Sequence, residues 1–531
     1  MNEHNSRFWT GETSRRIEQR IIVEADLVLE TPAHFGDGDA NDFTDMPLLI
    51  CTDVNGKTAP LLTGATLTGA LRAYLNNREF GFRANATKPY ALSELLFGAQ
   101  KGDEEDNGRQ SALIIEDAFG QASADMEMRE NVKLDNATRT AHTTEVTVNG
   151  QKFRRGELFD MQLWPIGTTF PIRFELLLMQ TPRQMKMETG EYQAKVKEAF
   201  LIALDGLTDG SITLGARKNR GLGRIALENW RVKAYDLKND LYAWLESGYL
   251  PLAQLNEAVL THPKKAEVFE EISPRDNREW LEIELTCRLD PSSSLLIRDS
   301  GGADSGVDAV HLRSSGQPIL SGTSLTGALR ARAQRIVHLV YPDNPKTAQR
   351  RLDALFGSDL HIKQGDNTTG KKRNQNAKAS RLIVEEHVIE DAVVDRVQNR
   401  VSIDRFTGGA RDTALFSEQP LFGTKETRVK VKWRLLKPVA ANNKKGAGDR
   451  EFKAQIGLLL LLLKDLWTAD LPVGGEISVG RGRLQGIKAE IKLYQPDKPK
   501  PQTWTIQDGT RPDNYHQLQT YVDALWEEVS L

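Results

Sequence analysis

The sequence predicts an α+β protein made of two tandem copies of one domain. Residues 60–75, PLLTGATLTGALRAYL, return as PILSGTSLTGALRARA at residues 318–333. The matched helix glycines differ in number by 322 − 64 = 258, and the arginines that end the last match differ by 483 − 224 = 259. This offset is too long for a solenoid unit and fits a duplicated domain.

Weaker matches follow the first one in the same order along the chain. They pair LLFG at 95–98 with ALFG at 354–357, ALIIEDA at 112–118 with RLIVEEH at 381–387, ELFDMQ at 157–162 with ALFSEQ at 414–419, and GLGR at 221–224 with GRGR at 480–483. Because the order of the segments repeats as well as their content, we expect both halves to share one topology.

The size and composition of the chain narrow the class of protein. A length of 531 residues exceeds one ordinary core, whereas halves of about 220 residues lie in the usual domain range. With 70 basic against 73 acidic residues, only local basic clusters could hold an anionic partner. Two cysteines are too few for a disulfide framework. The N-terminus lacks an apolar signal core, and no apolar run reaches the roughly 20 residues of a membrane span, so we expect a cytoplasmic protein without a membrane contact.

Each copy is predicted to begin with a strand, at 17–30 and at 281–289, where apolar and polar residues alternate. An irregular loop rich in Gly and Asp follows each strand, at 31–45 and 290–308. The loop leads into the shared TGALR segment, which is predicted to be a helix. In the first copy one face of that helix carries Leu67, Ala70, Leu71, Tyr74 and Leu75.

The middle of each copy, 99–170 and 358–430, is more polar and less periodic, which favours protruding insertions on a compact core. After it come a strand, an apolar helix, a turn rich in Gly and Arg, and a final strand. The predicted strands are at 170–178 and 428–436, and the predicted helices at 195–204 and 452–466. This element order is that of the ferredoxin-like fold.

The domain boundaries follow from the repeated segments. We expect a first domain at 15–235, a mostly helical connector at 236–279, a second domain at 280–495 and a C-terminal tail at 496–531.

Two kinds of segment could bind phosphate. The Gly-rich turns, GARKNRGLGR at 215–224 and VGRGR at 479–483, would let backbone approach a phosphate while their cations compensate its charge. The starts of the TGALR helices offer unpaired N–H groups to an anion. Tight hairpins with solvated charges and simple capped helices are the alternatives. The candidate residues are Gly64, Arg72, Lys218, Arg220, Arg224, Gly322, Arg330, Arg481 and Arg483.

Taken together, these segments resemble the RAMP superfamily backbone subunits of type III CRISPR effector complexes. The shared pattern is an Asp-bearing loop, PxLxGxSLxGALR, LFG, an IDRxTG stretch and an RGxGR turn. Two such domains in one chain look like the tandem subunit of type III-D systems. The second copy keeps VSIDRFTGGARDTALF at 401–416 whole, whereas the first copy, at 132–159, has Asn136 and a longer loop.

The resemblance implies a modified ferredoxin-like fold, similar to the RNA-recognition motif, that wraps CRISPR RNA. It also implies that each insertion is a thumb that displaces one base at regular steps. An aspartate in the loop before PxLxGxS would cut the paired target RNA. The matching residues are Asp45 and Asp308, at 64 − 45 = 19 and 322 − 308 = 14 residues before the helix glycines. Rivals that stay open are Asp37, Asp39, Asp42, Asp299 and Asp304.

The chemistry of an aspartate limits its role. A carboxylate with a pKa of about 3.9 is a poor base near neutrality, but it is a good ligand for Mg²⁺ or Mn²⁺. We therefore expect Asp45 and Asp308 to hold a hydrated metal ion or to orient the nucleophile. His34 and His311 lie in or beside the same loops and are further candidates for acid or base, although they do not align with each other.

The resemblance implies a metal-dependent endoribonuclease that binds CRISPR RNA and target RNA beside other backbone and accessory subunits. Two alternatives remain open on the sequence. One is a non-catalytic RNA-binding scaffold of the same kind of complex, and the other is a guide-processing endoribonuclease.

Overall fold

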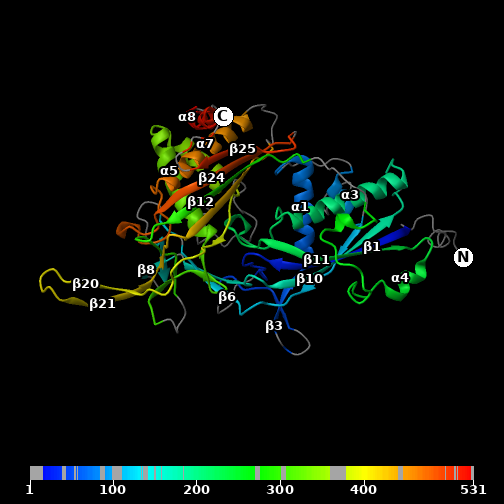
Figure 1. The fold of residues 1–531 in the computed structure, drawn as a ribbon, viewed down its shortest axis with the longest axis horizontal. Coiled ribbons are helices and arrows are strands. Elements are labelled where there is room, and N and C mark those ends of the chain that lie inside the picture. The colour runs from blue at the N-terminus through cyan, green and yellow to red at the C-terminus, as the bar shows by residue number, and fades with distance from the viewer. Residues whose placement is uncertain are drawn as a thin grey trace.

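The chain folds into two α+β domains that lie side by side in Figure 1. The first domain is drawn mainly in blue to green and the second mainly in green to red. The computed structural model describes residues 16–38, 44–52, 56, 58–83, 90–98, 110–132, 134–135, 141–148, 151–156, 158–182, 185–269, 276–300, 306–358, 378–439, 447–496, 498–507, 510, 512 and 514–527.

The first domain is built on a four-stranded antiparallel sheet. Its strands are β1 (Ile17–Leu29), β4 (Leu113–Ile115), β10 (Thr169–Met179) and β11 (Ile225–Asp236), in the order β11-β1-β10-β4. The central strand β1 pairs along nearly its whole length with both β10 and β11. Alternation of buried and exposed residues in β1 and β10 gives the sheet one apolar face.

The second domain repeats this sheet strand for strand. It contains β12 (Trp280–Leu289), β18 (Leu382–Val384), β23 (Arg428–Leu436) and β24 (Leu484–Tyr494), in the order β24-β12-β23-β18. With one helix after the first strand and one before the last, both domains have the predicted ferredoxin-like topology. The fold class predicted from the sequence is thus confirmed.

Two helices pack on the apolar face of each sheet. They are α1 (Gly64–Phe80) and α3 (Thr189–Thr208) in the first domain, and α5 (Gly322–Val340) and α7 (Ala447–Trp467) in the second. Thr63 caps α1 and Ser321 caps α5, because each side chain accepts an N–H from the first turn at 3.2 Å.

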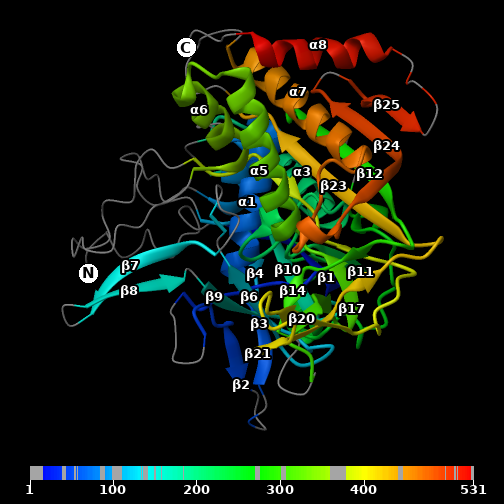
Figure 2. The same ribbon diagram turned by 90° about the vertical axis from the view of Figure 1, so that its left-hand side faces the viewer.

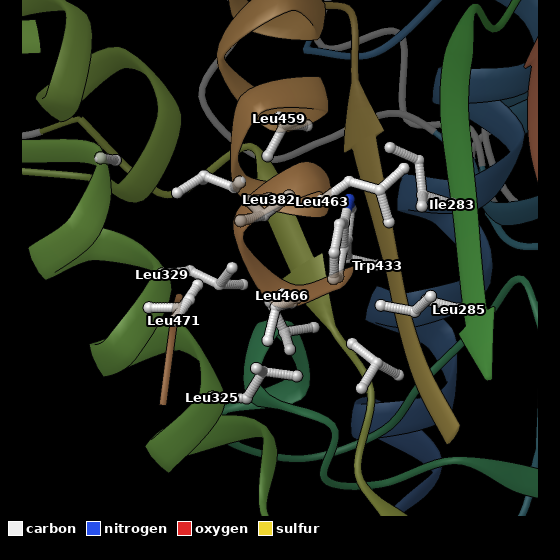
Figure 3. Close-up of a cluster of buried hydrophobic side chains, with 14 of the residues drawn as sticks. Ile283, Leu285, Leu325, Leu329, Leu382, Trp433, Leu459, Leu463, Leu466 and Leu471 are labelled. Carbon is white, nitrogen blue, oxygen red and sulfur yellow. The ribbon is translucent and has the colours of Figure 1, made fainter. Parts of the chain in front are cut away.

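The core of the second domain shows how these layers meet. In Figure 3 the leucines of α7, among them Leu463 and Leu466, lie beside Trp433 of β23 and Ile283 of β12. All four side chains are buried. The apolar run in α7 is therefore core, as its length predicts. Among the described residues, no helix is long and apolar enough to cross a membrane.

Each domain carries a protruding insertion. In the first, β6 (Glu127–Val132) pairs with β9 (Leu158–Leu163), and β7 (Thr143–Val148) pairs with β8 (Gln151–Gly156). The β7–β8 hairpin extends from the body in Figure 2. In the second, β20 (Gln398–Ile403) and β21 (Ala410–Gln419) form the long hairpin that projects in Figure 1. We call these insertions the thumbs.

The connector and the tail differ from the sequence prediction. The segment 236–279 is not mostly helical, since its described part holds only α4 (Leu241–Ser247) and a 3-10 turn η2 (Pro263–Lys265). Pro251 and Pro263 interrupt helical periodicity there. In the tail, β25 (Gln502–Gln507) adds a strand beside β24, and α8 (Tyr515–Trp526) packs on α7. The tail therefore extends the second domain.

Short elements complete the two domains. They are α2 (Leu92–Phe97), α6 (Pro345–Phe356), β2 (Ile50–Thr52), β3 (Thr58–Leu62), β5 (Ala118–Phe119), β13 (Ser294–Leu295), β14 (Arg298–Asp299), β15 (Ala309–His311), β16 (Arg313–Ser314), β17 (Gln317–Leu320), β19 (His387–Val388), β22 (Leu421–Phe422) and the 3-10 turns η1 (Lys218–Arg220) and η3 (Ile477–Val479).

Candidate functional site

The two candidate aspartates occupy equivalent positions beside the bases of the thumbs. The Asp45 N–H donates to Asp160 Oδ1 at 2.7 Å, and the Asp160 N–H donates to Asp45 Oδ2 at 3.2 Å. The Asp308 N–H donates to Ser417 Oγ at 3.1 Å, and the Ser417 N–H donates to Asp308 Oδ2 at 2.7 Å. Asp160 and Ser417 occupy the same place in the repeated ELFDMQ and ALFSEQ segments. The structure thus matches Asp45 with Asp308 despite their unequal distances from the helices.

The electrostatics of Asp308 favour an ionised carboxylate. The Asp45 and Asp308 side chains are both exposed. The backbone N–H of Ser417, followed by its hydroxyl, lowers the pKa of Asp308. An aspartate that is ionised throughout the neutral range is a weak proton acceptor and a good partner for a cation.

Each candidate site has few side-chain oxygens that could hold a cation. Within the described part of the chain, no three His, Cys, Asp or Glu side chains come together as a metal-binding group. The first site offers two neighbouring carboxylates, Asp45 and Asp160, and the second offers Asp308 beside the Ser417 hydroxyl. Mg²⁺ is commonly held by one or two carboxylates, with water and substrate phosphate supplying the remaining oxygens.

Among the rival aspartates, Asp37 and Asp299 also form a matched pair. In the first domain Gly36 forms a β-bridge with Leu48, and in the second Arg298 pairs with His311 in the same way. The residues that follow Gly36 and Arg298 in the chain are therefore equivalent. Their environments differ, because Asp37 is exposed whereas burial raises the pKa of Asp299. The other rivals, Asp39, Asp42 and Asp304, lie outside the described residues.

A cavity of about 740 Å³ joins three of the predicted segments in the first domain. Its lining includes Asp45 from the loop, Thr63 and Thr66 from the start of α1, and Lys218 from the Gly-rich turn. The structure therefore brings the candidate aspartate and one candidate cation to a single hollow. That hollow is open at the surface, as a strand of RNA would require.

The two candidate histidines are both buried. His34 is buried, with Nδ1 2.8 Å from the carbonyl oxygen of Gln162. His311 is buried between backbone groups, since its Nδ1 accepts the Ile297 N–H at 3.3 Å and its Nε2 lies 3.0 Å from the Ile319 carbonyl oxygen. Burial lowers the pKa of His311 to about 4. The burial of His311 argues against an acid or base role for its ring, whereas His34 lines the cavity together with Asp45.

The helix-start glycines receive protein groups at the positions where phosphate was expected. The Gly64 N–H donates to Asp117 Oδ1 at 2.7 Å. A Cβ atom added at Gly322 would lie 2.2 Å from the carbonyl oxygen of Arg220, so glycine is needed there for close backbone packing. Phosphate at Gly64 would have to displace Asp117, and phosphate binding at Gly64 and Gly322 stays a prediction.

The helix arginines also have protein partners. Arg72 donates to the carbonyl oxygen of Phe97 at 2.9 Å, and Arg330 donates to that of Gly357 at 3.3 Å. Both acceptors belong to the repeated LFG segments, so this contact is a shared structural feature of the two domains.

The Gly-rich turns have one backbone conformation in both domains. Arg217 and Glu476 have φ of 54° and 55°, and Gly223 and Gly482 have φ of 73° and 75°. A Cβ atom added at Gly223 would lie 1.8 Å from the carbonyl oxygen of Leu214. These glycines therefore serve the tight turn itself.

The arginines of the two turns form different ion pairs. Arg224 pairs with Glu385 at 2.7 Å and with Glu30 at 3.0 Å. Arg481 is 2% exposed and pairs with Glu418 at 2.9 Å. The predicted phosphate contact of Arg481 is corrected, because a buried, paired guanidinium cannot reach RNA, and the ion pairs of Arg224 argue against a contact there as well.

Arg220 lies among other cations at the junction of the two domains. Burial, followed by the neighbouring guanidinium groups of Arg330 and Arg217, lowers the pKa of Arg220 to about 10. Arg220 Nη1 is buried and has no hydrogen-bond partner among the described residues. Arg220 belongs to the first domain and Arg330 to the second, so this cluster lies at their junction. Lys218 and Arg483 are exposed.

Several residues of the site were missed by the sequence reasoning. Asp160 and Ser417 could have been found, since the repeated segments already align them. Arg298 and Arg400 pair with Glu418 and Glu476 beside Arg481, so that three arginines face two glutamates. Phe406 is fully exposed at the tip of the second thumb.

One comparison with known proteins gave a match. The family model described as the RAMP superfamily matches residues 26–226 and 291–485, about three quarters of the chain. The first matched region spans α1 to α3 and the second spans α5 to α7, whereas the first and last strands of each sheet lie wholly or partly outside the matches. A search of curated proteins found no match.

Proposed function

The chain belongs to the RAMP superfamily, which implies an RNA-binding subunit of CRISPR ribonucleoprotein complexes, and we propose that it is a tandem backbone subunit of a type III complex. In this proposal it binds CRISPR RNA and cuts the paired target RNA once in each domain. The observation that supports this proposal most directly is the equivalence of Asp45 and Asp308. Both are exposed, and each accepts a backbone N–H from the base of a thumb. Fusion of two domains favours the type III-D group.

We assign the aspartates an orienting role. Asp308 stays ionised near neutrality, so a carboxylate of this kind binds a hydrated cation or aligns the attacking 2′-hydroxyl without accepting its proton. A bound Mg²⁺ or Mn²⁺ would stabilise negative charge that develops on the scissile phosphate. Asp160 and Ser417 keep each carboxylate turned to the surface.

We assign the RNA backbone to Lys218 in the cavity and to Arg220, whose Nη1 is buried without a hydrogen-bond partner among the described residues. At the tip of the second thumb, Asp404 Oδ1 accepts the N–H groups of Phe406 and Thr407, each at 2.9 Å, which fixes the turn. The exposed Phe406 ring is suited to stack on a displaced base.

Two alternatives are weaker. A guide-processing nuclease that relies on His311 is disfavoured, because that ring is buried and lies between backbone groups. A non-catalytic scaffold has the same RNA-binding cations and lacks only the cutting role. In either case we expect other backbone and accessory subunits as partners, in the cytoplasm.

The test of the proposed function is a chain with Asp45→Ala and Asp308→Ala in a reconstituted complex. Target cutting should fall by about a hundredfold or more, the scale of losing one positioned catalytic group. Binding of CRISPR RNA should not change, since neither aspartate contacts it in this proposal. Gel analysis of labelled target RNA measures the first quantity, and filter binding measures the second.

The matched control is Asp37→Ala with Asp299→Ala, the other equivalent pair of loop aspartates. It should leave cutting within about threefold of wild type. Unchanged cutting in the Asp45 and Asp308 variant would identify the chain as a scaffold. Loss of cutting only in the control would assign the cutting role to Asp37 and Asp299 instead.

A further inference from the structure

The first domain has a histidine at a position where the second domain has a leucine. The Ala216 N–H donates to the carbonyl oxygen of His34 at 3.0 Å, and the Gly475 N–H donates to the carbonyl oxygen of Leu296 at 2.7 Å. Ala216 and Gly475 belong to the same part of the repeated fold, just before the Gly-rich turns. His34 and Leu296 are therefore equivalent, and the second candidate site lacks this ring.

A hydrogen bond fixes the tautomer of His34. Its Nδ1 lies 2.8 Å from the carbonyl oxygen of Gln162. Because a carbonyl oxygen only accepts hydrogen bonds, Nδ1 carries the ring hydrogen. In the neutral ring Nε2 then keeps a lone pair and can accept a proton.

This second nitrogen of His34 faces the cavity that contains the candidate aspartate. A Cβ atom added at Gly36 would lie 2.5 Å from His34 Nε2, and Gly36 is itself exposed. Glycine at this position therefore leaves Nε2 uncovered, although the rest of the ring is buried. His34, Gly36 and Asp45 all line the cavity of about 740 Å³.

The corresponding place in the second domain is closed. Leu296 is fully buried, and Arg298, which takes the place of Gly36, pairs with Glu418 at 3.0 Å. His311 does not replace the missing ring, since both of its nitrogens lie against backbone groups. Only the first site thus combines a loop aspartate with an accessible imidazole nitrogen among the described residues.

The proposed cutting reaction needs a proton acceptor that a loop aspartate does not supply. The attacking 2′-hydroxyl has to lose its proton, and an ionised aspartate is a weak base near neutrality. Imidazole is the side chain that most often accepts a proton in this range. A neutral histidine with a free Nε2 beside the aspartate meets this need.

We propose that His34 Nε2 accepts the proton of the attacking 2′-hydroxyl in the first domain, an inference that rests on the proposed cutting function. As the proton moves to Nε2, the 2′-oxygen forms a bond to phosphorus and the bond from phosphorus to the 5′-oxygen breaks. The 5′-oxygen takes a proton from water, and the hydroxide left behind takes the proton held by the ring. The products are a 2′,3′-cyclic phosphate and a 5′-hydroxyl end. In the second domain water takes the place of the ring.

The test is His34→Asn in a reconstituted complex, with the two cuts in labelled target RNA followed separately. Asparagine keeps an N–H for the Gln162 carbonyl and removes the lone pair of Nε2. The cut that Asp45→Ala removes should slow by about a hundredfold or more, the scale of losing a general base. The cut that Asp308→Ala removes should continue at the wild-type rate, because the second domain has leucine at this position. Free imidazole should restore the first cut in His34→Ala, which it would not do for a defect of folding.

The matched control is His338→Asn, a change of an exposed histidine on α5, which should leave both cuts unchanged. Equal thermal unfolding and equal binding of CRISPR RNA show that each variant is folded. Absence of both cuts with wild type would refute the proposed function itself. The proposal for His34 is overturned, with the cutting function intact, if the first cut persists in His34→Asn, if wild type makes only the second cut, if both cuts are lost together, or if imidazole restores nothing.

Discussion

The buried ionisable residues show how environment decides the role of a side chain. Burial lowers the pKa of both His311 and His387 to about 4, so each ring is neutral in the folded protein near neutrality. Asp308 is exposed, and hydrogen bonds from Ser417 keep it ionised. Sequence distinguishes none of these states, because the groups that set them lie far away in the chain.

Because His311 is buried, we expect the free energy of unfolding to depend on pH. Between its ordinary pKa of 6.5 and its folded value of about 4, the unfolded chain binds a proton that the folded chain excludes. Stability therefore falls as pH falls through this window, by about 1.4 kcal/mol per unit near the middle. His311→Asn should remove about that much of the slope of unfolding free energy against pH. Urea unfolding followed by tryptophan fluorescence from pH 4.5 to 7 measures it, and equal slopes in both proteins would contradict the account.

Individual residues also show which features of the site could be predicted from the sequence. Asp45 and Asp308 could be identified from the sequence because they precede a repeated motif. The burial of Arg481 could not be predicted, because its partner Glu418 lies on the thumb strand β21, far from Arg481 in the sequence. In the first domain Leu222 and Met161 hold the aligned positions, so the same contact is apolar there.

At the scale of elements, periodicity predicted the sheets and their helices well. Alternation in β1 and β12 and the apolar helix faces were visible because each element buries one side. The connector 236–279 was overestimated as helix, since its apolar residues reflect packing on the first domain: Leu252 and Phe269 are buried. Strand β25 was missed because Pro residues precede it and its burial comes from the neighbouring β24.

The turn elements carry a prediction on RNA affinity. Replacing Lys218 and Arg220 by Ala should weaken binding of CRISPR RNA and make the plot of log affinity against log salt shallower. Each lost phosphate contact removes about 0.7 from the slope for a single strand. Filter binding at several salt concentrations measures this effect, with Lys195→Ala as the control that keeps the slope. A slope unchanged in the turn variant would mean that RNA follows another surface.

At the scale of the whole molecule, duplication explains the architecture. Two ferredoxin-like domains repeat the same sheet order, the same turn angles and the same clamped aspartate. At their junction the η1 turn of the first domain packs on β18 and α5 of the second, and Arg220 lies near Arg330 there. Two equivalent sites at a fixed separation would cut one target at two places.

The lengths of target fragments test this claim most directly. A reconstituted complex with wild-type chain should give two cuts from this subunit. Asp45→Ala should remove one of them and Asp308→Ala the other, each fusing two neighbouring fragments into one. If both single variants give the wild-type set of fragments, or if either one abolishes both cuts, the two domains are not independent and equivalent cutting sites.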